Sequence, residues 1–251
     1  MEFFQKINEA MEQRKPAVLC LVVETGGSTP RKSGSKMLVY SDGRIDGTIG
    51  GGNIEKELIA EALNALKTGE NSLKTFQLSK DLEMQCGGKM TVYIEPLVCP
   101  PQLVIFGAGH ISGALAKMAA IAGFSITVAD DRKGIFESWE QKNVSMVEKP
   151  FDEAIKSIDF NQNSYIVVCT YLHESDLKVV AGCLSLPHKY LGMIGSKRKI
   201  EKTATLLEKD FGFTKDQIQS IDMPIGIPIA CETPEEIAVS ILARLVDVRN
   251  S

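Results

Sequence analysis

Residues 102–113 read QLVIFGAGHISG, and this stretch decides the fold of the second half of the chain. An apolar run stops abruptly at Gly107, a second glycine follows at Gly109, and a helical pattern then runs to Gly123. This is the order of a buried strand, a tight turn and a helix, the first unit of a dinucleotide-binding fold. Gly107 permits the sharp turn. Gly109 lets the backbone approach a phosphate where the helix N-terminus presents unpaired N–H groups.

A second apolar run at residues 126–129 ends in Asp130, followed by Asp131. An acid at the end of this strand is where such a fold holds a ribose hydroxyl, so Asp130 is a candidate cofactor-binding residue. His110 directly follows Gly109 and would lie near the same ligand, although a lone histidine is more often structural. The spacing G-x-G-x-x-x-G places the third glycine one residue late, so a sheet whose glycines only permit close packing remains the alternative.

Composition limits the classes of function. The chain has 251 residues, enough for one large domain or two ordinary ones, with 44% hydrophobic and 24% charged residues. A net charge of −4 gives no general attraction to nucleic acid or to an anionic membrane. No apolar run reaches membrane-spanning length, and the N-terminal MEFF lacks the basic start of a signal peptide. We therefore expect a cytoplasmic protein without nucleic-acid or membrane partners.

Two polar loops of the first half are candidate binding sites. Residues 24–35 combine glycines, hydroxyls and cations, which suits a phosphate or an oxyanion-rich ligand. A second glycine cluster opens an amphipathic helix at residues 54–67, where an anion is also favoured. The alternatives are a solvated surface hairpin for the first loop and a tight backbone crossover for the second. The candidate cofactor-binding residues are Gly26, Gly27, Ser28, Thr29 and Arg31, with Gly50, Gly51 and Gly52.

Cys86 is the one cysteine whose surroundings suggest chemistry. Six cysteines are present and no two are spaced as C-x-x-C, so neither a structural zinc site nor a disulfide framework is indicated. Cys86 lies outside the apolar strand patterns, and two glycines follow it. A thiolate there is a soft ligand for a thiophilic metal and a persulfide carrier, so Cys86 is a candidate metal and cofactor ligand. The alternative is a small buried residue at a loop corner.

The proline-rich segment PLVCPP, residues 96–101, has the composition of a linker. We therefore expect an N-terminal α+β domain over residues 1–98 and a doubly wound, mostly parallel α/β domain over residues 99–251. In the second domain a strand at residues 190–194 runs into a helix through Gly195, Ser196 and Lys197. Ligands bind at such strand ends, so these three residues are further candidates. The alternative is a helix-capping serine with a solvated basic turn.

These motifs resemble one known family in chain order. TGGSTPR (25–31), GTIGGG (47–52) and CGG (86–88) resemble the N-terminal domain of XdhC/CoxI proteins, the xanthine dehydrogenase accessory factors. FGAGH (106–110), DDR (130–132), GSKRK (195–199) and TPEEIA (233–238) are similar to the Rossmann domain of that family. One departure stands out. After Thr170 the family tends to carry two histidines bracketing an acid, whereas Tyr171 and Leu172 precede His173 here, and Asp176 is retained.

The resemblance implies a cofactor chaperone rather than a metabolic enzyme. Family members bind the molybdenum cofactor (molybdopterin), assist its sulfuration by a cysteine desulfurase and insert it into an apo molybdenum hydroxylase such as xanthine dehydrogenase. We expect the same cargo and partners here, in a homodimer. The alternative is an NAD(P)-dependent oxidoreductase, because Gly107, Gly109 and Asp130 would serve a dinucleotide equally well. A third reading is a protein that only scaffolds the desulfurase against its target. The N-terminal loops favour the chaperone, since they have no obvious role in a plain dehydrogenase.

Overall fold

The computed structural model describes residues 2–13, 15–78, 88–97, 99–141 and 143–251. The chain divides into two compact units, Met1–Cys99 and Pro100–Ser251. This division falls in the proline-rich segment. Independent folding of the two units stays a prediction.

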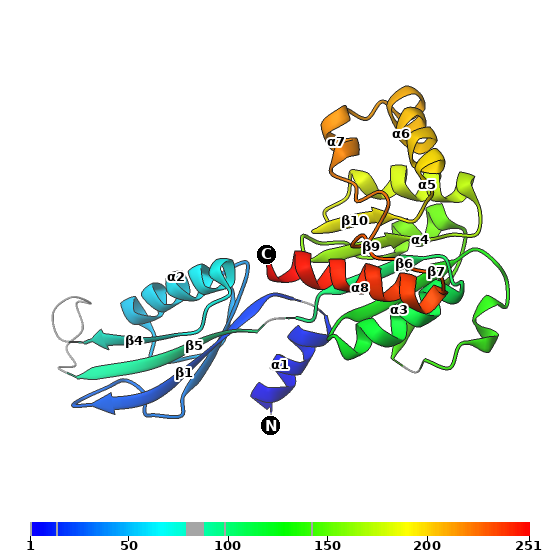
Figure 1. Ribbon diagram of the computed structural model, residues 1–251. Coiled ribbons are helices and arrows are strands. Elements are labelled where there is room, and N and C mark those ends of the chain that lie inside the picture. Colours follow the sequence, from blue (N-terminus) through cyan, green and yellow to red (C-terminus); the bar gives the residue numbers. More distant parts are fainter. Residues whose placement is uncertain (1, 14, 79–87, 98, 142) are drawn as a thin grey trace. The chain divides into compact units, whose positions relative to one another are not determined.

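The first unit is a five-stranded antiparallel sheet with helices (Figure 1). The sheet order is β3-β2-β1-β5-β4. The strands are β1 (Ala17–Gly26), β2 (Lys36–Tyr40), β3 (Ile45–Gly47), β4 (Ser72–Gln77) and β5 (Lys89–Leu97). The helices are α1 (Glu2–Glu12) and α2 (Gly52–Thr68).

Helix α2 covers one face of this sheet because its apolar residues recur at helical spacing. Ile54, Leu58, Ala62 and Ala65 are buried on one side of the helix. They share a core with the inward-facing residues of β1, β2, β4 and β5. The helix ends at Gly69, whose φ of 71° is the left-handed conformation typical of a helix C-terminus.

The second unit is built on a five-stranded parallel sheet in the order β10-β9-β6-β7-β8. The strands are β6 (Gln102–Phe106), β7 (Ser125–Asp130), β8 (Val144–Glu148), β9 (Ser164–Val168) and β10 (Tyr190–Met193). The helices are α3 (His110–Ile121), α4 (Phe151–Ser157), α5 (His173–Leu184), α6 (Lys197–Phe211), α7 (Lys215–Gln219) and α8 (Pro234–Asn250), with a 3-10 turn at Ile135–Ser138. The expectation of a doubly wound, mostly parallel sheet is confirmed.

The central strands are buried on both faces, which is why they read as continuous apolar runs. Along β6, Leu103 and Ile105 face a core shared with α3 and α8. Val104 and Phe106 face the opposite core, shared with α4, α5, α6 and α7. Figure 1 shows these helices on the two faces of the sheet.

The strand order reverses between β6 and β9. From β6 the chain proceeds outward through β7 and β8, then returns to β9 on the other side of β6 and continues to β10. Ligands of open α/β sheets bind outside the carboxyl ends of the strands at such a reversal. In the described part of the chain, no helix is long and apolar enough to cross a membrane.

The two units offer a matched pair of core substitutions. Leu58 and Leu115 are fully buried, one in each unit. Replacing either with alanine should lower the free energy of unfolding by about 2–5 kcal/mol, through lost burial and the cavity left behind. In scanning calorimetry we expect two transitions, with Leu58→Ala lowering the midpoint of one and Leu115→Ala that of the other. Lys117→Ala, at an exposed position of α3, is the control. A single transition shifted by both core variants would contradict two independent domains.

Candidate functional site

The two glycines after β6 have different surroundings. Gly107 has a φ of +105°, and a Cβ there would lie 2.3 Å from the carbonyl oxygen of Cys169. The fold itself therefore requires glycine at this position. Gly109 has an ordinary φ of −84° and begins α3 as its N-cap. A Cβ at Gly109 would have no atom within 4 Å, and both Gly109 and His110 are exposed. Nothing within the described chain fills the space over Gly109, so it is open to a ligand.

Asp130 holds the glycine turn in place. Its carboxylate is fully buried and accepts a hydrogen bond of 2.7 Å from the N–H of Ala108. Arg132 donates to the same carboxylate from its backbone N–H, from Nε and from Nη2, at 2.8–3.0 Å. Burial raises the pKa of Asp130, but the hydrogen bonds from Arg132 and Ala108 outweigh it and hold the pKa below its ordinary value. Both carboxylate oxygens are thus engaged within the chain, and the expected contact with a ribose hydroxyl stays a prediction.

Tyr171 packs over this ion pair. The Arg132 guanidinium lies 4.6 Å from the centre of the Tyr171 ring, a cation–π contact. Tyr171 and Leu172, the two positions that depart from the family pattern, are 48% and 50% exposed. Burial and the nearby Asp131 carboxylate raise the pKa of Tyr171, so its phenol stays neutral at ordinary pH.

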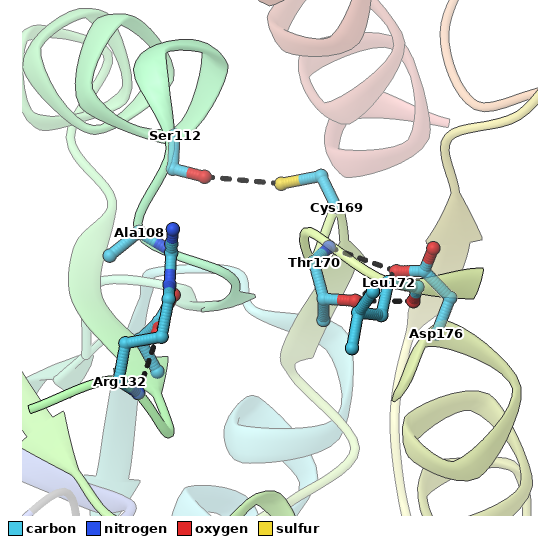
Figure 2. Close-up of polar contacts among 8 residues, drawn as sticks. Ala108, Ser112, Arg132, Cys169, Thr170, Leu172 and Asp176 are labelled. Atoms are coloured by element: carbon cyan, nitrogen blue, oxygen red, sulfur yellow. Dashed lines mark hydrogen bonds and ion pairs between the residues drawn. The ribbon is translucent and has the colours of Figure 1, made fainter. Parts of the chain in front are cut away.

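A cysteine that the sequence motifs did not single out lies at the end of β9. Cys169 Sγ and Ser112 Oγ are 3.1 Å apart, and their side chains point toward each other in Figure 2. Burial raises the pKa of the Cys169 thiol to about 11, with the Ser112 hydrogen bond acting in the opposite direction. The thiol is therefore neutral at ordinary pH and is not an activated nucleophile. Its sequence signal was its place directly after a buried strand, at the edge where ligands bind.

Asp176 ties together the ends of β9 and β10. It accepts hydrogen bonds from the backbone N–H of Thr170 at 2.9 Å and from Thr170 Oγ1 at 2.8 Å, as Figure 2 shows. It also forms an ion pair with Lys199, whose ammonium donates to the carbonyl of Ile194 at 2.9 Å. Asp176 is fully buried, and its retention in the chain is explained by this positioning role. His173, at the first position of α5, is exposed.

The third predicted segment caps α6. Ser196 is the N-cap residue and accepts a 3.4 Å hydrogen bond from the N–H of Lys199. A Cβ at Gly195 would lie 3.1 Å from the Lys199 side chain. Ser196 lines a pocket between α5 and α6 that Lys197 does not line, although Lys197 is exposed. The structure therefore brings Ser196 to a pocket and leaves Lys197 on the surface beside it.

The sequence motifs of the first unit meet in one place. A Cβ at Gly50 would lie 2.4 Å from Pro30 Cγ, so the loop before α2 packs against the loop after β1. A Cβ at Gly88 would lie 2.3 Å from the carbonyl oxygen of Ser28 and 2.7 Å from that of Gly26. We call residues 26–35, residues 47–52 and Gly88 the loop cluster. Gly27, Ser28 and Arg31 are exposed in it, and Thr29 donates to the carbonyl of Arg31 at 2.9 Å. Cys86, the candidate metal ligand, lies outside the described residues.

Glu55 occupies the anion position that the sequence left for a ligand at the start of α2. Its Oε1 accepts from the N–H groups of Ile49 at 3.1 Å and Gly51 at 2.9 Å, and from Thr48 Oγ1. Burial raises the pKa of Glu55, but these hydrogen bonds prevail and lower it. A glutamate in the first helical turn after a glycine run was the available signal.

The space beside Gly51 and Gly52 is open, since a Cβ at either would have no atom within 4 Å. Both have positive φ, at 78° and 71°. Arg31 and Lys32 are exposed, and neither forms an ion pair with another described residue. A role of these residues in binding stays a prediction. No group of three or more His, Cys, Asp or Glu side chains in the described ranges is placed to hold a metal ion.

An antiparallel domain carrying a glycine-rich loop cluster, followed by a parallel domain with an open glycine turn at its strand reversal, defines a two-part protein with a Rossmann-type domain. Residues 103–245 match the family model described as the XdhC Rossmann domain, and residues 10–77 match that of the XdhC and CoxI family. The chain belongs to the XdhC and CoxI family.

Three relatives show how far the similarity extends. YqeB of Escherichia coli (strain K12), named as an uncharacterized protein, is 32% identical over 257 residues, 100% of this chain and 47% of the relative. A protein of Bacillus subtilis (strain 168), named as a probable xanthine dehydrogenase subunit, is 28% identical over 159 residues, 63% and 46% of the two chains. The "Molybdenum cofactor insertion chaperone PaoD" of Escherichia coli (strain K12) is 25% identical over 297 residues, 96% and 86%. The chain thus spans about half the length of the first two relatives.

A solved structure shows the same fold. The crystal structure of a xanthine dehydrogenase from Bacillus halodurans matches with a TM-score of 0.53 and 20% identity, covering 98% of this chain and 95% of that one. At this identity the likeness shows the fold alone.

The two glycines after β6 should respond differently to one added methyl group. Gly107→Ala should lower the free energy of unfolding of the second unit by about 2–5 kcal/mol, because it adds strain at a positive φ and a clash with Cys169. Gly109→Ala should change it by no more than about 0.5 kcal/mol. Denaturant titration measures both. Equal destabilisation by the two variants would mean that Gly109 is also required by the fold.

Asp130 should make the second unit sensitive to acid. Since its folded pKa lies below the ordinary value of 3.8, its stabilising contribution is present above that value and is lost as the pH falls toward the folded pKa. Between about pH 5 and pH 3 the parent should therefore lose stability more steeply than Asp130→Asn. At pH 7 the variant should be less stable by on the order of 2 kcal/mol, through weakened hydrogen bonds to Arg132 and Ala108. Identical slopes in parent and variant would refute this role.

Proposed function

We propose that this chain is an accessory factor that binds the molybdenum cofactor (molybdopterin), assists its sulfuration and inserts it into an apo molybdenum hydroxylase such as xanthine dehydrogenase. The observation that carries the proposal is the loop cluster, in which separate glycine motifs converge around exposed cations. The relative named as a molybdenum cofactor insertion chaperone supports it, because the alignment covers 96% of this chain and 86% of that protein.

The loop cluster has the chemistry for a pterin that carries a phosphate. Gly51 and Gly52 leave open space beside the backbone, and Ser28 offers a hydroxyl. Arg31 and Lys32 supply positive charge without an ion-pair partner among the described residues, which suits the phosphate. Because Glu55 already satisfies the N–H groups of Ile49 and Gly51, the loop is held in shape before a ligand arrives.

Cys86 has a distinct role in this proposal. It precedes Gly88 by two residues in the sequence, and Gly88 packs against the loop after β1. A thiolate supplies a soft ligand for the molybdenum centre and can carry a persulfide from a cysteine desulfurase. When bound, the cofactor supplies the dithiolene-held molybdenum and the phosphate. The desulfurase, the client hydroxylase, a homodimeric state and a cytoplasmic location belong to the same proposal.

The Rossmann-type domain would take a phosphate of the ligand at Gly109, where the N-terminus of α3 is exposed and its first turn carries no acidic residue. The alternative of an NAD(P)-dependent oxidoreductase receives no specific support from the site. Its ribose-binding acid, Asp130, is fully buried and is already bonded to Ala108 and Arg132.

Native mass spectrometry of protein purified from cells that make the cofactor tests the proposal. We expect a bound pterin. Arg31→Ala/Lys32→Ala should retain at least tenfold less of it, a loss of about 1.4 kcal/mol or more in binding free energy. Lys56→Ala/Lys67→Ala, which removes two exposed charges from α2 of the same unit, is the matched control and should retain the parental amount. A bound nicotinamide nucleotide in place of a pterin would contradict the proposal and favour the oxidoreductase.

In the same series, Cys86→Ser should keep the parental melting temperature and abolish activation of an apo molybdenum hydroxylase in a reconstituted assay. Full activation by this variant would assign Cys86 a structural role and leave the cofactor to the glycine loops.

A further inference from the structure

A pocket of about 570 Å³ lies in the second unit between the N-terminal turns of α5 and α6. Neither the glycine turn after β6 nor Asp130 lines it. It is therefore distinct from the place where the Rossmann-type domain would meet a dinucleotide.

Positive charge dominates the α6 side of this pocket. Arg198, Lys199 and Lys202 line it, and the first turn of α6 carries no acidic residue. Arg198 and Lys202 are exposed and form no ion pair with any other residue in the described ranges. On the α5 side, Glu174 also lines the pocket, but it is paired with Lys178 at 2.7 Å.

Lys199 is the most buried of these cations. Its side chain is 11% exposed, and its ammonium donates to Asp176 and to the carbonyl of Ile194. An ammonium has three N–H donors, so one remains for a ligand. Ser196 adds a hydroxyl whose oxygen already accepts from the N–H of Lys199, which leaves its O–H free to donate outward.

Thr203 gives an independent indication that the pocket holds a polar ligand. It lines the pocket, is only 5% exposed, and makes no side-chain hydrogen bond with any residue that the structure describes. Two positions along the same helix, Thr205 donates to the carbonyl of Glu201 at 2.8 Å, which is the usual way for a helix to satisfy a threonine. A buried hydroxyl without a partner is costly, and a ligand acceptor would satisfy it.

Leu177 and Leu206 form apolar parts of the same lining. A free inorganic anion would leave these surfaces uncovered, whereas an organic phosphate would place its phosphate by the cations and its carbon skeleton by the leucines. We propose that the pocket between α5 and α6 binds an organic phosphate, with Arg198, Lys199, Lys202 and the hydroxyls of Ser196 and Thr203 holding the phosphate group.

Amide chemical-shift mapping of the full chain tests this with two probes, inorganic phosphate and phenyl phosphate, at constant ionic strength. Both should produce saturable shifts within residues 196–203. Phenyl phosphate should also shift Leu177 and Leu206 and bind at least threefold more tightly. If phenyl phosphate binds no more tightly than phosphate, the organic part of the proposal is wrong.

Two double variants separate a built site from diffuse surface charge. Arg198→Ala/Lys202→Ala should weaken phenyl phosphate binding at least tenfold. Lys209→Ala/Lys215→Ala removes the same charge from exposed positions at the end of α6 and the start of α7, outside the pocket lining, and should leave binding unchanged. Thr203→Val keeps the shape of the side chain and removes the hydroxyl, so it should weaken binding without lowering the melting temperature. Equal weakening by both double variants, or shifts that do not saturate, would overturn the proposal. Either result leaves cofactor binding at the loop cluster unaffected.

Discussion

The buried carboxylate of Asp130 is the interaction on which the ligand edge of the second unit depends. It joins the end of β7 to the turn after β6 through the Ala108 N–H, and it holds Arg132 in a fixed position. Without it the turn would carry a buried N–H with no acceptor, which a folded protein tolerates poorly. Gly107 adds the complementary steric condition, since only glycine lets this turn approach the carbonyl of Cys169.

The same device recurs at two other loops. Glu55 gathers the N–H groups before α2, and Asp176 gathers Thr170 and Lys199 at the ends of β9 and β10. In each case the chain supplies its own anion, so the loop is ordered without a ligand, and binding need not provide that ordering energy. The helix starts that lack such an internal anion are α3 and α6, which have no acidic residue in their first turns. An external anion is favoured at those two helix starts for the same electrostatic reason that Glu55 is favoured at α2.

Much of the fold could be read from the sequence, because periodicity reports burial directly. The apolar runs at residues 102–106 and 164–168 are strands buried on both faces, and the spacing of Ile54, Leu58 and Ala62 places one face of α2 against its sheet. The site was harder to predict, because motifs give positions but not partners. The sequence placed Asp130 at the strand end, yet its bond to Ala108 spans 22 residues, and that between Lys199 and Asp176 spans 23. Such pairings arise only when parallel strands bring their carboxyl ends together.

Tyr171 shows how one side chain alters the electrostatics of this edge. Its ring covers Arg132, which is bonded to Asp130, so the aromatic contact extends the chain of interactions from Ala108 to the loop after β9. The family pattern tends to place a histidine near this point, and histidine gains a positive charge close to neutral pH. A second cation beside the guanidinium would repel it and weaken its hold on Asp130 as the pH falls. The raised pKa of Tyr171 keeps the ring uncharged instead. The stack on Arg132 is therefore insensitive to pH in the physiological range, and the glycine turn keeps one shape across it.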